Sequence, residues 1–210
     1  MKKILVIIMA LLTLGTAVST VSAKDDKTEK AAQKAEKKAA KADKKAAKAE
    51  KRLVEYEELC ANYQPLATIG VPAADDMVAT LNIVVPALNS VYEKVGYIEF
   101  ETHEAEDEIT GEKVVVVDRA YDRRTGQDID VEKKKSEYKE CTAEFVAISA
   151  SAVTLTSSVM GFAQDPKQLI ALGLQGKNIL KQAKMITAVV PLIREKIKTD
   201  SEIIETMKNN

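Results

Sequence analysis

The feature that most constrains the fold is a run of twenty residues that carries no charged side chain. It spans residues 145–164 and reads FVAISASAVTLTSSVMGFAQ. At helical spacing its residues form two stripes on roughly opposite sides of a helix, one large and one small. The large stripe comprises Phe145, Ile148, Ala152, Leu155, Val159 and Phe162, and the small stripe comprises Ala147, Ser151, Thr154, Ser158 and Gly161.

A helix without a charged face is typically covered on all sides. We therefore expect this segment to be the central helix of a bundle, with its hydroxyl groups bonded to the backbone and its small stripe against a close neighbour. The alternative is a membrane-inserting hairpin formed by residues 145–176. Twenty residues reach ~30 Å as a helix, enough to cross the apolar part of a bilayer, and small residues promote helix association in lipid.

A second helix is predicted from the alanine- and lysine-rich heptads KAEKKAAKADKKAAKAEKRL of residues 34–53. Alanine, lysine and glutamate are strong helix formers. One stripe follows the alternating steps of three and four that define a coiled-coil seam: Ala32, Ala35, Ala39, Ala42, Ala46, Ala49, Leu53, Tyr56 and Cys60. Because alanine buries little apolar area, pairing along this seam should be weak. Residues 24–52 are thus predicted to form a long, mostly exposed, coiled-coil-like arm.

Charge is segregated along the chain. Residues 24–52 hold 12 basic and 6 acidic side chains, whereas residues 53–131 hold 5 basic and 17 acidic ones. The arm can therefore contact an anionic envelope polymer, and the candidate contacts are Lys34, Lys37, Lys38, Lys41, Lys44, Lys45 and Lys48. It has no interleaved aromatic residues and only Arg52 as an arginine, so no nucleic-acid partner is expected. Pairing of two arms along this seam would form a homo-oligomer, which is a further possibility for the arm.

The first 23 residues have the pattern of a secretory signal peptide. Two lysines precede an apolar run, and Val21-Ser22-Ala23 supplies small residues before a cleavage site. The apolar run is shorter than the ~20 residues that span a bilayer, and no cysteine near the cut can accept a lipid. We expect a secreted or periplasmic protein whose mature chain begins after Ala23.

The rest of the chain predicts a helical bundle domain over residues 53–210 with an inserted sheet. A kinked helix is expected over 72–95, and strand-like alternation then predicts a three-stranded antiparallel β-meander over about 97–131, with strands at 97–104, 112–121 and 127–131. Asp130 is placed to cap a helix that starts at Val131. The predicted fold is mainly α: a four-helix bundle with an inserted meander and the N-terminal helical arm.

Two cysteines, Cys60 and Cys141, are predicted to form a disulfide because an exported chain with an even cysteine count favours one; free thiols and an intermolecular bridge are the alternatives. His103 is the only histidine and has no partner at metal-ligand spacing. No Gly-rich phosphate loop and no nucleophile motif is present. We therefore expect neither an enzyme nor a bound cofactor or metal.

These observations predict an exported, non-enzymatic structural or interaction protein of the bacterial cell envelope, with a helical bundle displayed on a helical arm. Two other functions stay open. One is a membrane-active protein that inserts or forms pores with residues 145–176, and the other is a binder of anionic envelope polymers through the basic arm. The partner is an unidentified protein or an anionic envelope component.

Overall fold

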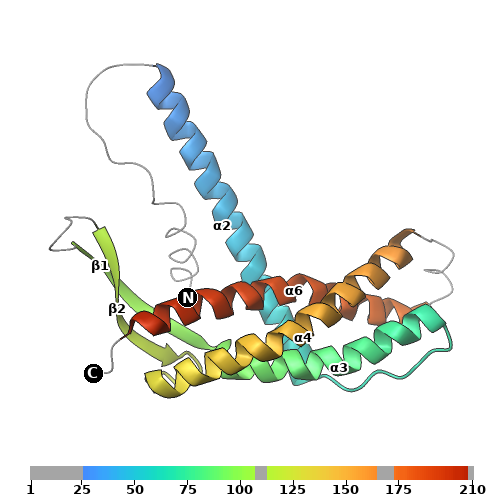
Figure 1. The fold of residues 1–210 in the computed structure, drawn as a ribbon. Coiled ribbons are helices and arrows are strands. Elements are labelled where there is room, and N and C mark those ends of the chain that lie inside the picture. Colours follow the sequence, from blue (N-terminus) through green and yellow to red (C-terminus); the bar gives the residue numbers. More distant parts are fainter. Residues whose placement is uncertain (1–25, 107–112, 165–172, 208–210) are drawn as a thin grey trace. The chain divides into compact units, whose positions relative to one another are not determined.

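The computed structural model describes residues 26–106, 113–164 and 173–207, with side chains described from residue 37 onward except Lys113 and Ala163. The predicted signal peptide lies outside these residues. The described residues contain four helices: α2 (Asp26–Ala61), α3 (Pro72–Val95), α4 (Val131–Gln164) and α6 (Gly173–Thr206). Two strands, β1 (Ile98–Glu106) and β2 (Lys113–Asp122), separate α3 from α4 (Figure 1). The prediction of a mainly helical chain is confirmed.

The chain divides into two compact units, residues 1–54 and residues 55–210. In the second unit α3, α4 and α6 pack against one another, with α4 antiparallel to both of its neighbours (Figure 1). Helix α2 contributes its last two turns to this unit, where Tyr56 is fully buried and meets the ring of Tyr92 edge to face. The predicted four-helix bundle therefore has three full-length helices here.

The helix boundaries follow signals in the sequence. Pro72 occupies the first turn of α3, where its missing N–H costs nothing. The carboxylate of Asp130 accepts a hydrogen bond from the Lys133 backbone N–H at 3.0 Å, which confirms the predicted cap of α4. The large stripe of α4 also faces the core, because Phe145, Ile148, Ala152, Leu155 and Phe162 are buried.

The predicted three-stranded meander is wrong, because within the described residues, which include the segment 127–131, the sheet has two strands. Strands β1 and β2 pair antiparallel with a bulge at Glu101/Thr102. The segment expected to be the third strand makes a single bridge between Tyr121 and Asp128. Its side chains serve other contacts, since Asp128 pairs with Arg119 and Asp130 caps α4. Residues 127–130 are thus used for one bridge, an ion pair and the cap of α4 rather than for a third strand.

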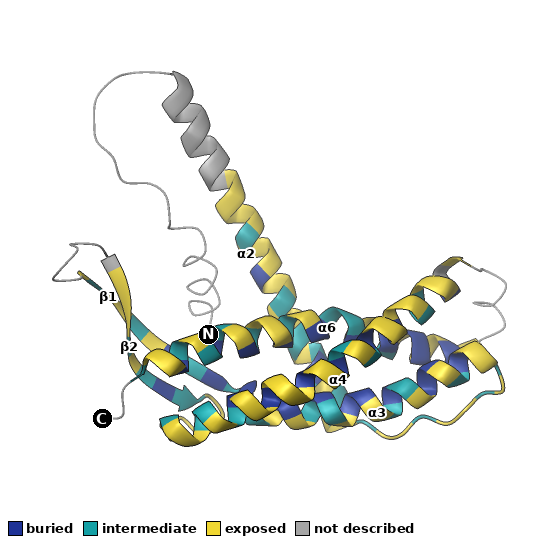
Figure 2. Ribbon diagram, viewed as in Figure 1, coloured by how far each residue is buried: buried dark blue, intermediate teal, exposed yellow. Residues whose placement is uncertain are grey.

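The prediction that α4 is covered on all sides is also wrong. Ala147, Thr154 and Gly161 of the small stripe are exposed, and Ser151 and Ser158 are half-buried. Exposed positions run along most of α4 beside the buried ones (Figure 2). The hydroxyl groups of four side chains each donate a hydrogen bond to the backbone carbonyl four residues earlier. These side chains are Thr154, Thr156, Ser157 and Ser158. Uncharged side chains that are satisfied within their own helix do not require a neighbour.

Candidate interaction surfaces

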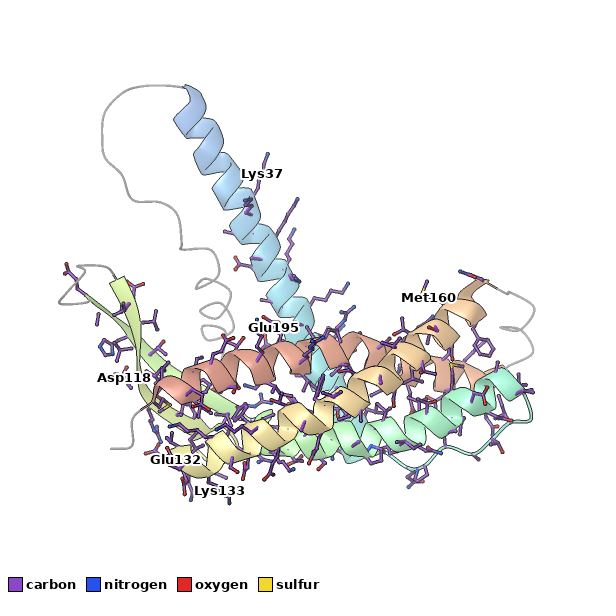
Figure 3. All side chains as sticks on the ribbon, viewed as in Figure 1. Lys37, Asp118, Glu132, Lys133, Met160 and Glu195 are labelled. Atoms are coloured by element: carbon purple, nitrogen blue, oxygen red, sulfur yellow. The ribbon has the colours of Figure 1, made fainter. Side chains whose placement is uncertain are left out.

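The outer face of α4 carries three exposed large apolar side chains and no exposed charge between Phe145 and Gln164. Val146, Val153 and Met160 are 70%, 66% and 57% exposed; Met160 lies near the C-terminal end of the helix (Figure 3). Within the described residues, Val131–Phe162 is the one helix long and apolar enough to cross a membrane, yet only 28% of its most apolar 18-residue stretch is buried. This apolar stretch is therefore not simply a core helix.

A groove of about 530 Å³ separates the start of this face from α6. It is lined by Thr142, Phe145, Val146, Ser149, Arg194, Ile197, Lys198, Ser201 and Glu202. The α4 wall is apolar or hydroxylated, whereas the α6 wall carries two cations and one carboxylate. Because residues of both helices line the groove, it extends the α4 surface toward α6.

The predicted polyanion-binding lysines lie on a single face of α2. At 3.6 residues per turn, Lys34, Lys37, Lys38, Lys41, Lys44, Lys45 and Lys48 fall within about 120° of the helix circumference. We call this set the lysine face. Six of them are exposed, while the side chain of Lys34 lies outside the described residues; Lys37 is labelled in Figure 3. Asp43 and Glu50 occupy the opposite side of the helix.

The two cysteines are free thiols in this structure. Cys141 is fully buried, which raises the pKa of its thiol to about 11. Cys60 is half-buried, and burial raises its pKa as well. The thiolate is the reactive form, so both thiols are weak nucleophiles as they stand. The Cys60–Cys141 disulfide stays a prediction. The mass of unreduced, denatured protein after alkylation tests it, and uptake of two labels would contradict it.

His103 lies on the exposed hairpin with its Nδ1 2.7 Å from an Asp118 carboxylate oxygen. Asp118 is the extra residue of the β-bulge, opposite the break between Glu101 and Thr102. Among the residues that the structure describes, no group of three or more histidine, cysteine or acidic side chains could hold a metal ion. The pair is a surface ion pair when the imidazole is protonated.

A buried polar cluster joins α4, α6 and the start of β1. Asp200 is fully buried, and one of its carboxylate oxygens accepts hydrogen bonds from the Tyr138 hydroxyl at 2.9 Å and the Lys196 ammonium at 2.7 Å. Lys196 also donates to the backbone carbonyl of Ile98 at 2.8 Å. Burial raises the pKa of Asp200, and Lys196 counteracts part of that rise. In the sequence, the one indication of this cluster is the four-residue spacing of Lys196 and Asp200, which allows an ion pair on one face of a helix.

Comparisons with protein families, with curated proteins and with solved structures find no match to this chain.

Proposed function

We propose that this chain is a non-enzymatic interaction protein of the bacterial cell envelope that binds an anionic polymer through the lysine face of α2. The observation that carries the proposal is the gathering of the lysines on one side of a continuous helix, with the acidic residues on the other. In this proposal residues 24–52 act as an arm, and the signal peptide directs the protein to the envelope.

The lysine face suits a flexible polymer more than a shaped ligand. From Lys34 to Lys48 the helix rises ~21 Å, so the seven lysines form a band about four turns long. A polymer with regularly spaced phosphates or carboxylates can follow such a band and release its counterions. Lysine binds anions as a mobile point charge without fixed geometry. The expected binding is therefore strongly dependent on salt and weakly selective among anionic polymers.

The test compares neutralised lysines on α2 with neutralised lysines elsewhere. Polyphosphate and poly-L-glutamate serve as the phosphate and carboxylate probes, and binding is followed by fluorescence anisotropy over a range of salt concentrations. The α2 variant is Lys41→Gln, Lys44→Gln and Lys48→Gln. The matched control removes the same charge from exposed positions of α6, by Lys177→Gln, Lys181→Gln and Lys184→Gln.

The α2 variant should bind at least tenfold more weakly and show a shallower salt dependence, because each lost phosphate contact removes roughly 0.7–0.9 from the slope of log affinity against log salt. The α6 variant should bind nearly as tightly as the parent chain. Equal losses in the two variants would show that net charge, rather than the lysine face, drives binding. Circular dichroism checks that helix content is unchanged.

Membrane activity is the second candidate, and the exposed, uncharged face of α4 favours it. Residues 145–164 of the proposed inserting hairpin lie in this helix, while residues 165–172 are outside the described residues. Dye release from vesicles of mixed neutral and anionic lipid, at micromolar protein, would support insertion. Intact vesicles together with a cooperative thermal transition of the protein would exclude it.

A further inference from the structure

The exposed face of α4 has the spacing of a coiled-coil seam. Its central residues follow alternating steps of three and four, the pattern that keeps side chains in line between two paired helices. We call this set the α4 seam: Ala143, Val146, Ala150, Val153, Ser157, Met160 and Gln164. All seven are exposed. The chain therefore buries one side of α4 in its own core and leaves a second, regular seam in solvent.

The flanks of the seam on α4 itself carry no charged side chain. They comprise Thr142, Ala147, Ser149, Thr154, Thr156 and Gly161. The hydroxyl groups of Thr142, Thr154 and Thr156 donate to carbonyls of their own helix. The one charged side chain between Thr142 and Gln164 is Glu144, which is engaged with Lys94 of α3. A partner helix can therefore approach along ~30 Å of α4. The charged neighbours of the seam are Arg194, Lys198 and Glu202 of α6, which line the groove beside its N-terminal part.

We propose that the α4 seam binds the α4 seam of a second copy of this chain, with the two helices antiparallel. In this arrangement the sizes of the seam residues match. A two-fold axis between positions 150 and 153 places Ala143 against Met160 of the second copy, Val146 against its Ser157, and Ala150 against its Val153. Each small residue thus meets a larger one, and layers of alternating size are what a close-packed interface requires.

The charge at the end of the seam fixes the direction. One step before Ala143 the seam reaches Lys139, whose ammonium is exposed and 3.6 Å from Glu205. Antiparallel pairing places Lys139 beside Gln164 of the second copy, at the C-terminal end of its α4, where the helix dipole favours a cation. Parallel pairing would bring two Lys139 side chains together and would place alanine against alanine and Met160 against Met160.

A second copy fits this face better than lipid does. Binding of a helix to a bilayer surface scales with the apolar area that it inserts, and the seam offers three large aliphatic side chains separated by alanine and serine. The same small residues favour close helix contact. The seam is short, so the interface falls below the ~800 Å² per partner of standard complexes, and we expect dissociation in the micromolar range.

Sedimentation velocity tests the proposal by measuring the monomer–dimer equilibrium. The protein is expressed as the full chain and then purified. The parent chain should pass from monomer to dimer as its concentration rises through the micromolar range. Ala150→Glu places a carboxylate at the centre of the seam and should weaken the dimer at least tenfold. Ser90→Glu adds the same charge to an exposed position of α3 and should leave it unchanged. Melting temperatures verify that both variants fold.

A charge exchange then tests the register. In the double variant Ala150→Glu, Val153→Lys, antiparallel pairing brings the introduced carboxylate of one copy against the introduced ammonium of the other, so dimerisation should recover. A parent chain that is monomeric at all concentrations would overturn the proposal, as would a dimer indifferent to Ala150→Glu. Failure of the double variant to recover would overturn the antiparallel register. A monomer that binds anionic vesicles, and loses that binding in Ala150→Glu, would assign the seam to lipid instead.

Discussion

Replacing Lys196 with methionine should lower the free energy of unfolding by about 3–5 kcal/mol at neutral pH, the usual cost of removing one partner of a buried ion pair. The Asp200 carboxylate has no exposure to solvent. Its second oxygen has no hydrogen-bond partner among the described residues. Without Lys196 the carboxylate keeps only the hydrogen bond from the Tyr138 hydroxyl. The backbone carbonyl of Ile98 also loses the hydrogen bond that the Lys196 ammonium donates to it. Methionine supplies the stem but not the charge.

The loss should depend on pH in a defined direction. The pKa of Asp200 is raised in the folded chain, principally by burial, so the folded state holds this proton more tightly than the unfolded state does. The contribution of Asp200 to the free energy of unfolding is therefore fully present below the pKa of about 3.9 that it has in the unfolded chain. That contribution is lost as the pH rises through the pKa of Asp200 in the folded chain. In Lys196→Met the folded pKa rises further, because a favourable positive charge is gone. The deficit relative to the parent should shrink as pH falls toward 4.

Urea unfolding at several pH values measures this deficit. Lys198→Met is the matched control, since Lys198 is exposed on the same helix and lines the open groove. A surface change of this kind is expected to fall within about 0.5 kcal/mol of the parent. Equal losses in the two variants, or a deficit at Lys196 that is the same at pH 4 and pH 8, would show that the buried carboxylate does not govern the effect.

Local signals explain which parts of the fold were predictable. The helix over 72–95 was predicted from its heptad-like apolar spacing and Pro72, and the start of α4 from Asp130, because these signals act through neighbouring backbone groups. The large stripe of α4 was predicted as core, and all of its residues are buried except Val159, which is half-buried. The other side of α4 was predicted to be covered and is exposed. The prediction failed because a side of a helix without charged residues can be buried but does not have to be. Whether a neighbour is present depends on how many helices the unit has.

Longer-range contacts explain the remaining differences. The third strand was predicted from the Thr125-Gly126 turn at hairpin length, but Asp128 and Asp130 are engaged by Arg119 and by the α4 backbone. Asp200 was not singled out from the sequence; it is buried and accepts a hydrogen bond from Tyr138, which is 62 residues away in the chain. The α4 seam was present in the spacing of residues 143–164, and only the exposure of all seven positions distinguishes it from a core stripe.

Replacing Gly96 with alanine should destabilise the chain. Overpacking typically costs about 1–3 kcal/mol, and we expect a value in the upper part of this range. Gly96 ends α3, and a Cβ atom there would lie 2.5 Å from two ring carbons of Tyr92 and 2.6 Å from its carbonyl oxygen. The ring cannot move aside easily. It packs edge to face against Tyr56 and Tyr97, and its hydroxyl donates to Glu57 at 2.8 Å.

Gly161→Ala provides the matched control, because the same substitution meets the opposite environment. Gly161 lies within α4, and a Cβ atom there would have no heavy atom within 4 Å. Alanine in an exposed helix interior is favoured over glycine by roughly 0.5–1 kcal/mol, so this variant should be more stable than the parent. Urea unfolding at low protein concentration compares the two without a contribution from self-association. If Gly96→Ala unfolded at the same urea concentration as Gly161→Ala, the close packing of Tyr92 against the end of α3 would be refuted.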